Sequence, residues 1–401
     1  MSTNTRGASR SAAHALSLPL SVPAEEATEA ACEGSVTERW REIILSIRDE
    51  YLDPAQRFPW VIGFSGGKDS TAVAHGVFAA LLSMPPSQRA RQVHLVSNDT
   101  MVESPLVIAH LDIVTRQIKA AAQNLNLPIT VARTQPDLDK TFWVLLIGKG
   151  YPSPNLTMRW CTDRLKIQPT SGYIKRNISR YGGAIVVLGV RRDESQTRQR
   201  SIDKWRNGRG TNLTPHTDLP GALIYRPIVD LTTEDVWEIL GSYHAPWGGA
   251  HSDLFQLYRD AEGGECPVVL SKTEAPGCGT RNSRFGCWTC TVVEKDRSLQ
   301  GFVDSGNHHF KPLVEFRDWL KSVRNNPEMR QTYRRNGRLA FDVSGKHIPG
   351  PFTVRARKEI LDFLLRTQEE FGAQLITDAE LDLIYQYWTA DLQQKEGSSD
   401  E

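Results

Sequence analysis

The sequence has no unbroken run of roughly 18 apolar residues, the length at which a segment becomes a candidate membrane-spanning helix. The most apolar stretch near its start, residues 12–22, is broken by Ser and Pro and lacks a dense basic flank, so it is atypical of a signal peptide. The sequence also shows no internal repeat. We therefore expect a cytoplasmic protein rather than a membrane or secreted one.

Cysteine is scarce, with six residues in a chain of 401. They are too few and too unevenly placed for a disulfide scaffold in a protein of this size. Four of the six fall within 25 positions, at Cys266, Cys278, Cys287 and Cys290. This clustering favours metal chemistry over disulfide bonds.

Neither sign of charge is in excess, because 48 Lys and Arg residues stand against 47 Asp and Glu residues. The overall charge therefore neither indicates nor excludes a nucleic-acid partner, and only local clusters are informative. Residues 191–210 contain seven basic residues against three acidic ones, and residues 321–358 contain ten against two. Each cluster is compatible with a nucleic-acid contact or with an ordinary solvated face.

Short β-rich runs alternate with helical periods in the first half of the chain. The strands are predicted over 60–64, 92–97, 129–132 and 184–189, and helices over 71–82 and 105–125. This alternation predicts an α/β fold in which helices flank a parallel sheet. Further helices are predicted over 38–51, 232–240, 312–323, 354–371 and 378–392, and Thr232 or Thr233 is the predicted cap of the second of these.

Composition divides the chain into five segments. We expect disordered tails over 1–35 and 393–401, an α/β domain over 36–262, a cysteine-rich segment over 263–300, and a helical, basic region over 301–392. The cysteine-rich segment has little periodicity and many Gly and Pro residues, so it needs a stabilising element other than an apolar core.

A glycine-rich turn directly follows the first predicted strand and reads Ser65-Gly66-Gly67-Lys68-Asp69-Ser70. Paired glycines let the backbone present N–H groups to phosphate oxygens, and the next helix adds its positive end. Lys68 adds a cation, the two serines add hydroxyl donors, and Asp69 is suited to hold Mg²⁺ or to orient the loop. The turn is not a Walker loop. It predicts a phosphate site, and an ordinary strand-to-helix turn is the alternative.

Two later segments reach the same predicted edge of the sheet. Asp99 and Thr100 follow the second strand, with Glu103 just beyond, and the fourth strand leads into Gly189, Arg191 and Arg192. Ligands of open α/β sheets bind along this carboxyl edge, and guanidinium groups are suited to clamp phosphate oxygens. These residues are therefore predicted to complete a nucleotide site. Arginines paired with acidic side chains at the surface are the alternative.

Cys161 lies among three cations, Arg159, Arg164 and Lys166. Such surroundings lower the pKa of a thiol and produce a nucleophilic thiolate, so Cys161 is a candidate persulfide carrier. A buried structural cysteine is the competing interpretation.

The four clustered cysteines supply enough thiolates for tetrahedral zinc or for an iron–sulfur cluster. Zinc ribbons usually present two close Cys pairs, whereas here only Cys287 and Cys290 are close. The spacing favours an iron–sulfur cluster, and zinc remains the alternative.

Several motifs together resemble the DndC family, the sulfurtransferases of bacterial DNA phosphorothioation. The glycine-rich turn is similar to the PP-loop of ATP pyrophosphatases, and the match runs from about Trp60 to Ser298. The motifs that carry the resemblance are Ser65–Ser70, Asp99-Thr100 with Glu103, Thr141–Val144, Gly148–Pro152, Arg159–Thr162, Leu188–Ser195, Pro246–Gly248, Glu265–Pro267 and Ser283–Cys290.

The resemblance implies a fold like that of phosphoadenylylsulfate reductases and an ATP pyrophosphatase activity with Mg²⁺ over residues 36–262. It implies a four-iron, four-sulfur cluster on Cys266, Cys278, Cys287 and Cys290, and replacement of a non-bridging DNA phosphate oxygen by sulfur. A cysteine desulfurase would supply the sulfur, and other Dnd proteins would form a complex with this chain. The residues that bind ATP would be Ser65–Ser70, Asp99, Thr100, Gly189, Arg191 and Arg192, with Lys68, Asp69 and Cys161 as catalytic residues.

Three other functions share parts of this pattern. A sulfate-activating reductase normally needs a cysteine near its C-terminus, and no cysteine follows Cys290. A tRNA thiolase would also use ATP and a persulfide. A non-catalytic scaffold would not need Lys68 and Asp69 beside the glycines.

DNA contact is expected from the second basic segment. Arg334, Arg335 and Arg338 are the predicted phosphate contacts, and a docking surface for an acidic partner protein is the alternative.

Overall fold

The computed structural model describes residues 35–194, 212–261 and 285–396. The described residues from Val36 onward belong to one compact unit. The predicted N-terminal tail, most of the first basic cluster, and Cys266 and Cys278 lie outside the described residues. In the described ranges, no helix combines the length and the apolar character that crossing a membrane requires.

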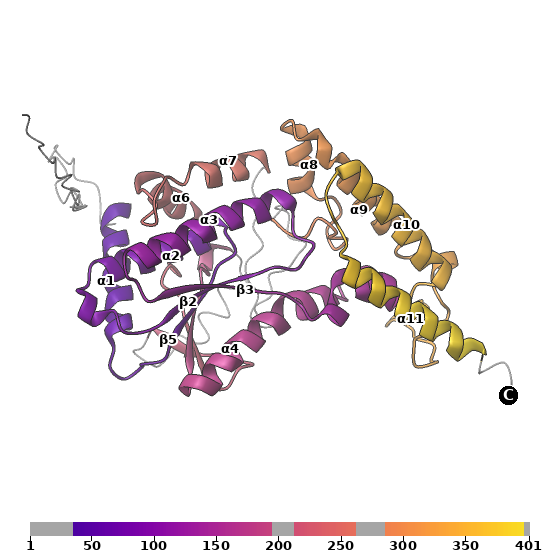
Figure 1. Ribbon diagram of the computed structural model, residues 1–401, viewed down its shortest axis with the longest axis horizontal. Coiled ribbons are helices and arrows are strands. Elements are labelled where there is room, and N and C mark those ends of the chain that lie inside the picture. Colours follow the sequence, from indigo (N-terminus) through magenta and orange to yellow (C-terminus); the bar gives the residue numbers. More distant parts are fainter. Residues whose placement is uncertain (1–34, 195–211, 262–284, 397–401) are drawn as a thin grey trace, which may run out of the picture. The chain divides into compact units, whose positions relative to one another are not determined.

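The described strands form one sheet of six in the order β3-β2-β1-β4-β6-β5 (Figure 1). Every neighbouring pair is parallel except β5 with β6. The predicted α/β fold with a parallel sheet is therefore confirmed, and the short strands β5 and β6 were not predicted. The strand bounds are β1 Trp60–Gly63, β2 Val93–Asn98, β3 Ile129–Thr134, β4 Ala184–Val187, β5 Leu213–Pro215 and β6 Ala222–Tyr225.

Helices cover both faces of the sheet. Helices α1 (Val36–Leu52), α2 (Lys68–Leu82), α3 (Pro105–Asn124) and α6 (Thr233–Ser242) lie on one face, and α4 (Gln168–Tyr181) lies on the other (Figure 1). Successive residues of a strand face opposite ways, so Ile62 joins the core under α2 while Val61 joins the smaller core under α4.

The chain reverses its direction of travel across the sheet after β3. The connections from β1 to β2 and from β2 to β3 move one way, and α4 then returns the chain past β1 to β4. The place where the strand order reverses, between β1 and β4, is where open α/β sheets bind ligands. The loops that follow β1 and β4 therefore meet at this point.

Most of the predicted helices are present. Helix α10 is Val354–Phe371, as predicted, and α9 is Lys311–Val323. The predicted cap of α6 is Thr232, which forms a capping box with Asp235. Helix α11 is Asp378–Glu396, so it continues past Leu392 into the predicted tail. The unpredicted helices are α4, α7 (Ser252–Asp260), α8 (Arg297–Asp304) and the π-helices Val144–Gly148 and Thr162–Ile167.

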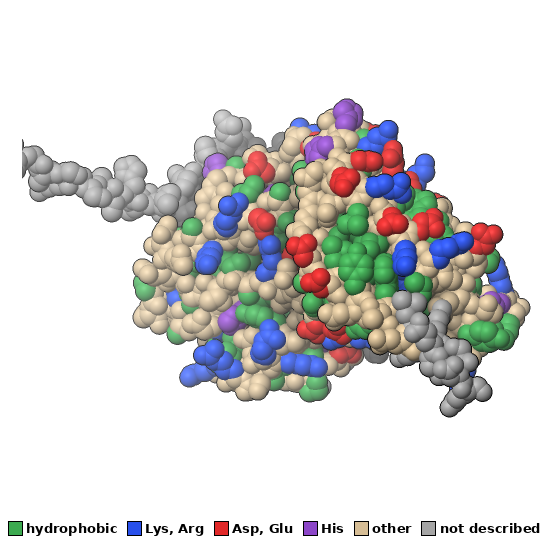
Figure 2. Space-filling view, turned by 45° about the vertical axis from the view of Figure 1, so that its right-hand side comes forward, with side chains coloured by type: hydrophobic (Ala, Val, Ile, Leu, Met, Phe, Trp, Pro, Cys, Tyr) green, Lys and Arg blue, Asp and Glu red, His purple; other side chains and the backbone are tan. Residues whose placement is uncertain are grey.

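The C-terminal helices share a core with the α/β part. The indole of Trp143 donates to the carbonyl oxygen of Leu375 at 2.7 Å, and the indole of Trp388 donates to that of Ile147 at 2.9 Å. The buried Arg357 guanidinium binds the carbonyl oxygen of Gly148 at 2.5 Å. These contacts fix α10 and α11 against the π-helix that begins at Val144. Lys, Arg, Asp and Glu side chains are mixed on the face turned forward in Figure 2.

A candidate nucleotide site beside a cysteine pair

The glycine-rich turn closes on itself through its two serines. The Ser65 amide donates to the Ser70 hydroxyl oxygen at 3.2 Å, and the Ser70 hydroxyl donates to the carbonyl oxygen of Gly67 at 2.9 Å. Gly66 has a φ of +77°, a conformation that side chains disfavour. The turn thereby brings the first amides of α2 to the carboxyl edge of the sheet, where they suit an anion.

Asp69 and Arg191 form a buried ion pair directly behind this turn. Nε of Arg191 lies 2.5 Å from Oδ1 of Asp69, and the two residues are 1% and 5% exposed. Arg191 also donates to the hydroxyl of Thr233 at 3.1 Å. Arg191 was predicted to clamp phosphate. Its guanidinium binds the Asp69 carboxylate, and this contact orients the loop. A contact between Arg191 and phosphate stays a prediction.

Gly189 lies where the loops after β1 and β4 come closest. A Cβ atom at this position would lie 2.7 Å from the carbonyl oxygen of Asp69. Real Cβ contacts are essentially never so short, so the close approach requires glycine here. Gly189 is therefore placed beside the phosphate loop, as its assignment to the nucleotide site requires.

Two residues that the sequence did not indicate touch the loop. The Tyr258 hydroxyl of α7 accepts a hydrogen bond from the Lys68 amide at 3.3 Å, and Nζ of Lys68 lies 5.8 Å from the Tyr258 ring centre. His110 of α3 lies beside Gly66, and burial lowers its pKa. Neither residue belongs to a recognisable motif, because each reaches the loop from a distant helix.

The predicted residues Asp99 and Arg192 make local contacts at the same edge. Asp99 accepts hydrogen bonds from the Met101 amide at 2.8 Å and from Gln135 at 3.0 Å. Arg192 lies 3.3 Å from Asp230. Both side chains hold loops that border the site.

Thr100 connects the sheet edge to a cysteine. Its Oγ1 lies 3.3 Å from Sγ of Cys287 and donates to Glu103 at 3.0 Å. Nζ of Lys166 lies 3.3 Å from the same Glu103 carboxylate, and both side chains are largely buried. Backbone bonds reinforce this contact, since the Trp288 amide donates to the carbonyl oxygen of Val102 at 3.0 Å. The turn that carries Cys287 and Trp288 is therefore docked onto the edge that carries the phosphate loop.

Cys287 and Cys290 lie on a tight turn. The Cys290 amide donates to the carbonyl oxygen of Cys287 at 3.0 Å, and both thiols are partly exposed. Two neighbouring thiols on one turn fit the requirements of a metal or cluster site. Cys266 and Cys278 lie outside the described residues. Within the described ranges alone, no three His, Cys, Asp or Glu residues are grouped to hold a metal ion.

Helix α9 holds the segment that follows this turn. The guanidinium of Arg317, which is 0% exposed, donates to the carbonyl oxygens of Cys290 at 2.8 Å and Glu294 at 3.0 Å, and also to that of Val293. Arg324 donates to the carbonyl oxygen of Thr291 at 2.8 Å. These bonds provide the stabilising element that the aperiodic sequence lacks.

Cys161 lies at the start of the π-helix Thr162–Ile167 and is half-buried against the main core. The same π-helix meets the end of β2, because the Asn98 amide group donates to the carbonyl oxygen of Leu165 at 2.9 Å. Cys161 and Cys287 thus belong to segments that both contact the β2 end of the site.

The three arginines predicted to bind DNA lie on an exposed loop between Gln331 and Gly350. Arg334 and Arg338 close a turn, in which the Arg334 amide donates to the carbonyl oxygen of Arg338 at 2.9 Å. Arg334, Arg335 and Arg338 are all exposed. They are available for contact with a partner, and they come from a part of the chain separate from the phosphate loop.

No curated protein matches the chain. The solved structures that match it include an FMN adenylyltransferase of Candida glabrata, with 9% identity, a TM-score of 0.32, and coverage of 61% of this chain and 65% of that one. A phosphoadenylyl-sulfate reductase of Candida auris has 12% identity, a TM-score of 0.30, and coverage of 54% and 89%. The U34-tRNA thiolase NcsA of Methanococcus maripaludis, solved with its [4Fe-4S] cluster, has 12% identity, a TM-score of 0.28, and coverage of 72% and 81%.

Residues 59–293 match the family described as the phosphoadenosine phosphosulfate reductase domain. The matched range is more than half of the 401 residues and contains all six described strands, the phosphate loop and the Cys287–Cys290 turn. The chain belongs to the phosphoadenosine phosphosulfate reductase domain family.

Proposed function

We propose that this chain is a DNA phosphorothioation sulfurtransferase of the DndC type, which uses ATP to replace a non-bridging backbone oxygen with sulfur. Membership of the family supports nucleotide-dependent sulfur chemistry. The observation that carries the proposal is the 3.3 Å contact between Thr100 and Cys287, at the sheet edge that also carries the phosphate loop. This contact supports the proposal because the two proposed sites, for phosphate activation and for sulfur, would adjoin one another there.

The proposed reaction has two displacements at phosphorus and one at sulfur. A non-bridging oxygen of the DNA phosphodiester attacks the α-phosphorus of ATP, so that an O–P bond forms and pyrophosphate leaves. The terminal sulfur of a cysteine persulfide then attacks the backbone phosphorus and expels AMP, which carries the original oxygen. A second thiolate attacks the sulfur of the carrier cysteine, so that the S–S bond breaks, the DNA phosphorothioate is released and a disulfide remains, which an external thiol reduces. Activation is required because an unmodified phosphodiester oxygen is a very poor leaving group.

The chain's own groups support the first displacement. The amides at the start of α2 and the Lys68 ammonium would stabilise the charge that develops on the leaving pyrophosphate. Mg²⁺ would share this task. The Arg191–Asp69 pair holds the loop in register.

Cys161, Cys266, Cys278, Cys287 and Cys290 are the proposed sulfur-handling residues. The last four would hold a four-iron, four-sulfur cluster, and the paired thiols of Cys287 and Cys290 on one turn fit that role. When bound, such a cluster would supply sulfur or electron transfer at the sheet edge. A cysteine desulfurase would deliver the sulfur, and further Dnd subunits would present the DNA.

The experiment is mass spectrometry of DNA hydrolysates for phosphorothioate dinucleotides, in cells that carry the complete system with this chain or without it. We expect phosphorothioate only with the wild-type chain. Lys68→Ala should lower it on the order of a hundredfold, because loss of one preorganised charge costs about 3 kcal/mol of barrier. Cys287→Ser should abolish it, and the exposed α3 variant Lys119→Ala should retain it.

Other outcomes would contradict the proposal. Sulfur found in tRNA and not in DNA would favour a tRNA thiolase. Full phosphorothioation with Lys68→Ala would favour a scaffold role. A protein purified without oxygen that contains stoichiometric zinc and no iron would contradict the cluster.

A further inference from the structure

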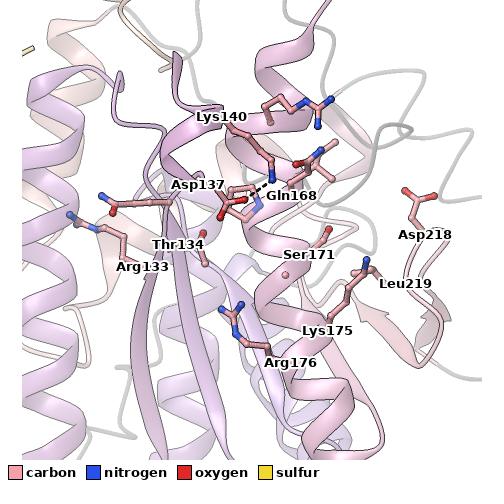
Figure 3. Close-up of a pocket in the computed structure, with 15 residues that line it drawn as sticks. Arg133, Thr134, Asp137, Lys140, Gln168, Ser171, Lys175, Arg176, Asp218 and Leu219 are labelled. Carbon is pink, nitrogen blue, oxygen red and sulfur yellow. Dashed lines mark hydrogen bonds and ion pairs between the residues drawn. The ribbon is translucent and has the colours of Figure 1, made fainter. Parts of the chain in front are cut away.

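A cavity of about 580 Å³ lies away from the phosphate loop, beside α4. The end of β3, with Arg133, Thr134 and Gln135, contributes to its wall, and α4 contributes Lys175 and Arg176. Figure 3 shows Ser171, Lys175 and Arg176 on α4, between Arg133 on one side and Asp218 on the other. In Figure 2, Lys and Arg side chains also gather on the lower part of the molecule, the side on which α4 lies.

The lining is rich in cations. It contains the basic residues Arg133, Lys140, Arg164, Lys175 and Arg176, and the acidic residues Asp137 and Asp218. Three of the cations have acidic partners, because Lys140 lies 2.5 Å from Asp137, Arg164 lies 3.7 Å from Asp163, and Arg133 contacts Asp112.

Lys175 and Arg176 differ from these three. Both are exposed, and no acidic side chain in the described part of the chain lies within ion-pair distance of either. Arg176 packs over the ring of Tyr173 on its own helix, at 5.5 Å from the ring centre. The α4 wall of the cavity therefore presents two charges that a ligand would neutralise.

The remaining polar groups also suit an oxyanion. Thr134, Gln135, Gln168 and Ser171 add hydroxyl and amide donors, while the lining contains no aromatic side chain on which a base could stack. Guanidinium, ammonium and hydroxyl donors are the groups that bind phosphate oxygens in nucleic-acid complexes. The chemistry of the cavity thus fits backbone phosphates better than bases.

The cavity lies close enough to the phosphate loop for one nucleic-acid strand to contact both. Strands β1, β2 and β3 are neighbours in the sheet, so the ends of β1 and β3 are roughly 10 Å apart at the usual strand spacing. A nucleic-acid strand carries one phosphate about every 3.4 Å along its axis. One strand can therefore reach both places within a few nucleotides.

We propose that the cavity beside α4 holds backbone phosphates of the DNA substrate and thereby positions a neighbouring phosphodiester at the phosphate loop. This inference rests on the proposed DNA function. It assigns Lys175 and Arg176 as positioning residues that bind without reading the base sequence.

The test compares two double variants of the full chain. Lys175→Gln with Arg176→Gln removes the two charges of the cavity. Arg41→Gln with Lys119→Gln removes two charges from exposed positions on α1 and α3, on the opposite face of the sheet. Affinity for a labelled DNA duplex is measured from low to physiological salt. ATP-dependent pyrophosphate release is measured without DNA, where water replaces the DNA oxygen as the attacking group.

The cavity variant should bind DNA at least about tenfold more weakly at low salt than the control variant. For this variant, the slope of log affinity against log salt should be smaller in magnitude by up to about 1.8, because each lost phosphate contact reduces the slope by roughly 0.9. The DNA-independent pyrophosphate release should be unchanged in both variants.

Two outcomes would overturn the inference. One is a cavity variant whose DNA affinity and salt dependence equal those of the control. The other is a raised KM for ATP with unchanged DNA affinity, which would make the cavity a site for a free nucleotide. Failure of the proposed function is separate, since it would show as the absence of phosphorothioate with the wild-type chain.

Discussion

At the scale of single residues, the candidate site depends on buried residues that fix the loops after β1 and β4 against each other. Arg191 and Asp69 are both buried, and their ion pair connects the loop after β4 to the loop after β1. Gly189 allows the two backbones to meet. A phosphate site with preset amides therefore requires contacts behind the loop as well as glycines within it.

Gly189→Ala tests this close approach. The added Cβ would lie 2.7 Å from the carbonyl oxygen of Asp69, so the loops must separate, and we expect a loss of about 1–3 kcal/mol in unfolding free energy. ATP affinity should fall as well. Denaturant unfolding and ATP titration measure the two effects.

Gly241→Ala in α6 is the matched control, because its Cβ would lie 3.6 Å from the ring of Phe255 on α7, an ordinary van der Waals contact. It should leave stability unchanged or slightly raised. If both alanine variants unfolded and bound ATP alike, the approach of the two loops would not require glycine.

Two buried histidines meet between α2, which contains His75, and the start of α7, where His251 precedes the helix. Nδ1 of His75 lies 3.4 Å from Nε2 of His251, among Trp40, Tyr243 and Trp247. Burial and then His251 lower the pKa of His75 to about 3. Burial and then His110 and His244 lower the pKa of His251 to about 4. Both rings are therefore neutral in the folded protein at neutral pH.

This pair predicts acid sensitivity. Above about pH 6.5 neither the folded nor the unfolded chain protonates these rings, so the stability is fully present. As the pH falls from 6.5 toward 4 the unfolded chain takes up protons that the folded chain excludes, and each histidine removes up to about 1.4 kcal/mol per pH unit. Denaturant unfolding between pH 7.5 and 4.5 measures this slope, and His75→Gln should reduce it. An identical slope in that variant would contradict the assignment.

At the scale of elements, α9 adds hydrogen bonds to the turn that carries Cys287 and Cys290, beside the apolar contacts of Phe285 and Trp288 with the main core. Arg317, Lys321 and Arg324 all donate to backbone carbonyl groups between Cys290 and Glu294. The β2–α3 connection holds the other side of the turn, through Val102 and Thr100. The turn that carries Cys287 and Cys290 is thus held between two elements that are far apart in the sequence.

Arg317→Met tests the contribution of α9, since it keeps much of the side-chain volume and removes the donors. The carbonyl groups it leaves without this partner are costly to bury, so we expect about 3 kcal/mol or more to be lost from the unfolding free energy. Alkylation of Cys287 and Cys290 by iodoacetamide should become faster. Thermal unfolding and peptide mass spectrometry measure these effects.

The control lies on the same helix. Lys311 is exposed and pairs only with Glu315 among the described residues, at 3.5 Å, so Lys311→Met should alter neither stability nor alkylation. If Arg317→Met matched the control variant in both measurements, Arg317 would have no such structural role.

At the scale of the whole molecule, the C-terminal region carries a loop that leaves the shared core. Residues 331–350 expose Tyr333, Phe341 and Val343 together with the three predicted DNA-binding arginines. Large exposed apolar side chains beside cations are typical of a contact surface. The loop is therefore a second candidate contact, separate from the cavity beside α4.

Alanine at Arg334, Arg335 and Arg338 together tests the loop. DNA affinity should fall for all sequences alike, and the slope of log affinity against log salt should become less steep by up to about 2.7, since up to three phosphate contacts are lost. ATP binding and thermal stability should survive because these side chains are exposed. Wild-type DNA affinity combined with failed assembly with the other Dnd proteins would identify a protein-docking surface instead.

The sequence alone determined the local parts of this protein. Strand periodicity predicted β1 to β4, the glycine pair predicted the turn after β1, and Thr232 or Thr233 was the predicted cap of α6. It missed α4, which continues from a π-helix, contains Pro169 near its start and has few apolar residues. Strands, turns and helix caps depend on residues that are close in the sequence. A sequence pattern can therefore predict them where the pattern is regular.

Only the tertiary structure decided which of these parts meet. Thr100 and Cys287 are 187 positions apart, and Asp69 and Arg191 are 122 apart. Their contacts depend on the strand order and on the return of the chain through α4, which local propensities do not specify. The tertiary structure likewise decided that Arg191 is buried beside Asp69, because a charge removed from water needs a fixed opposite charge beside it.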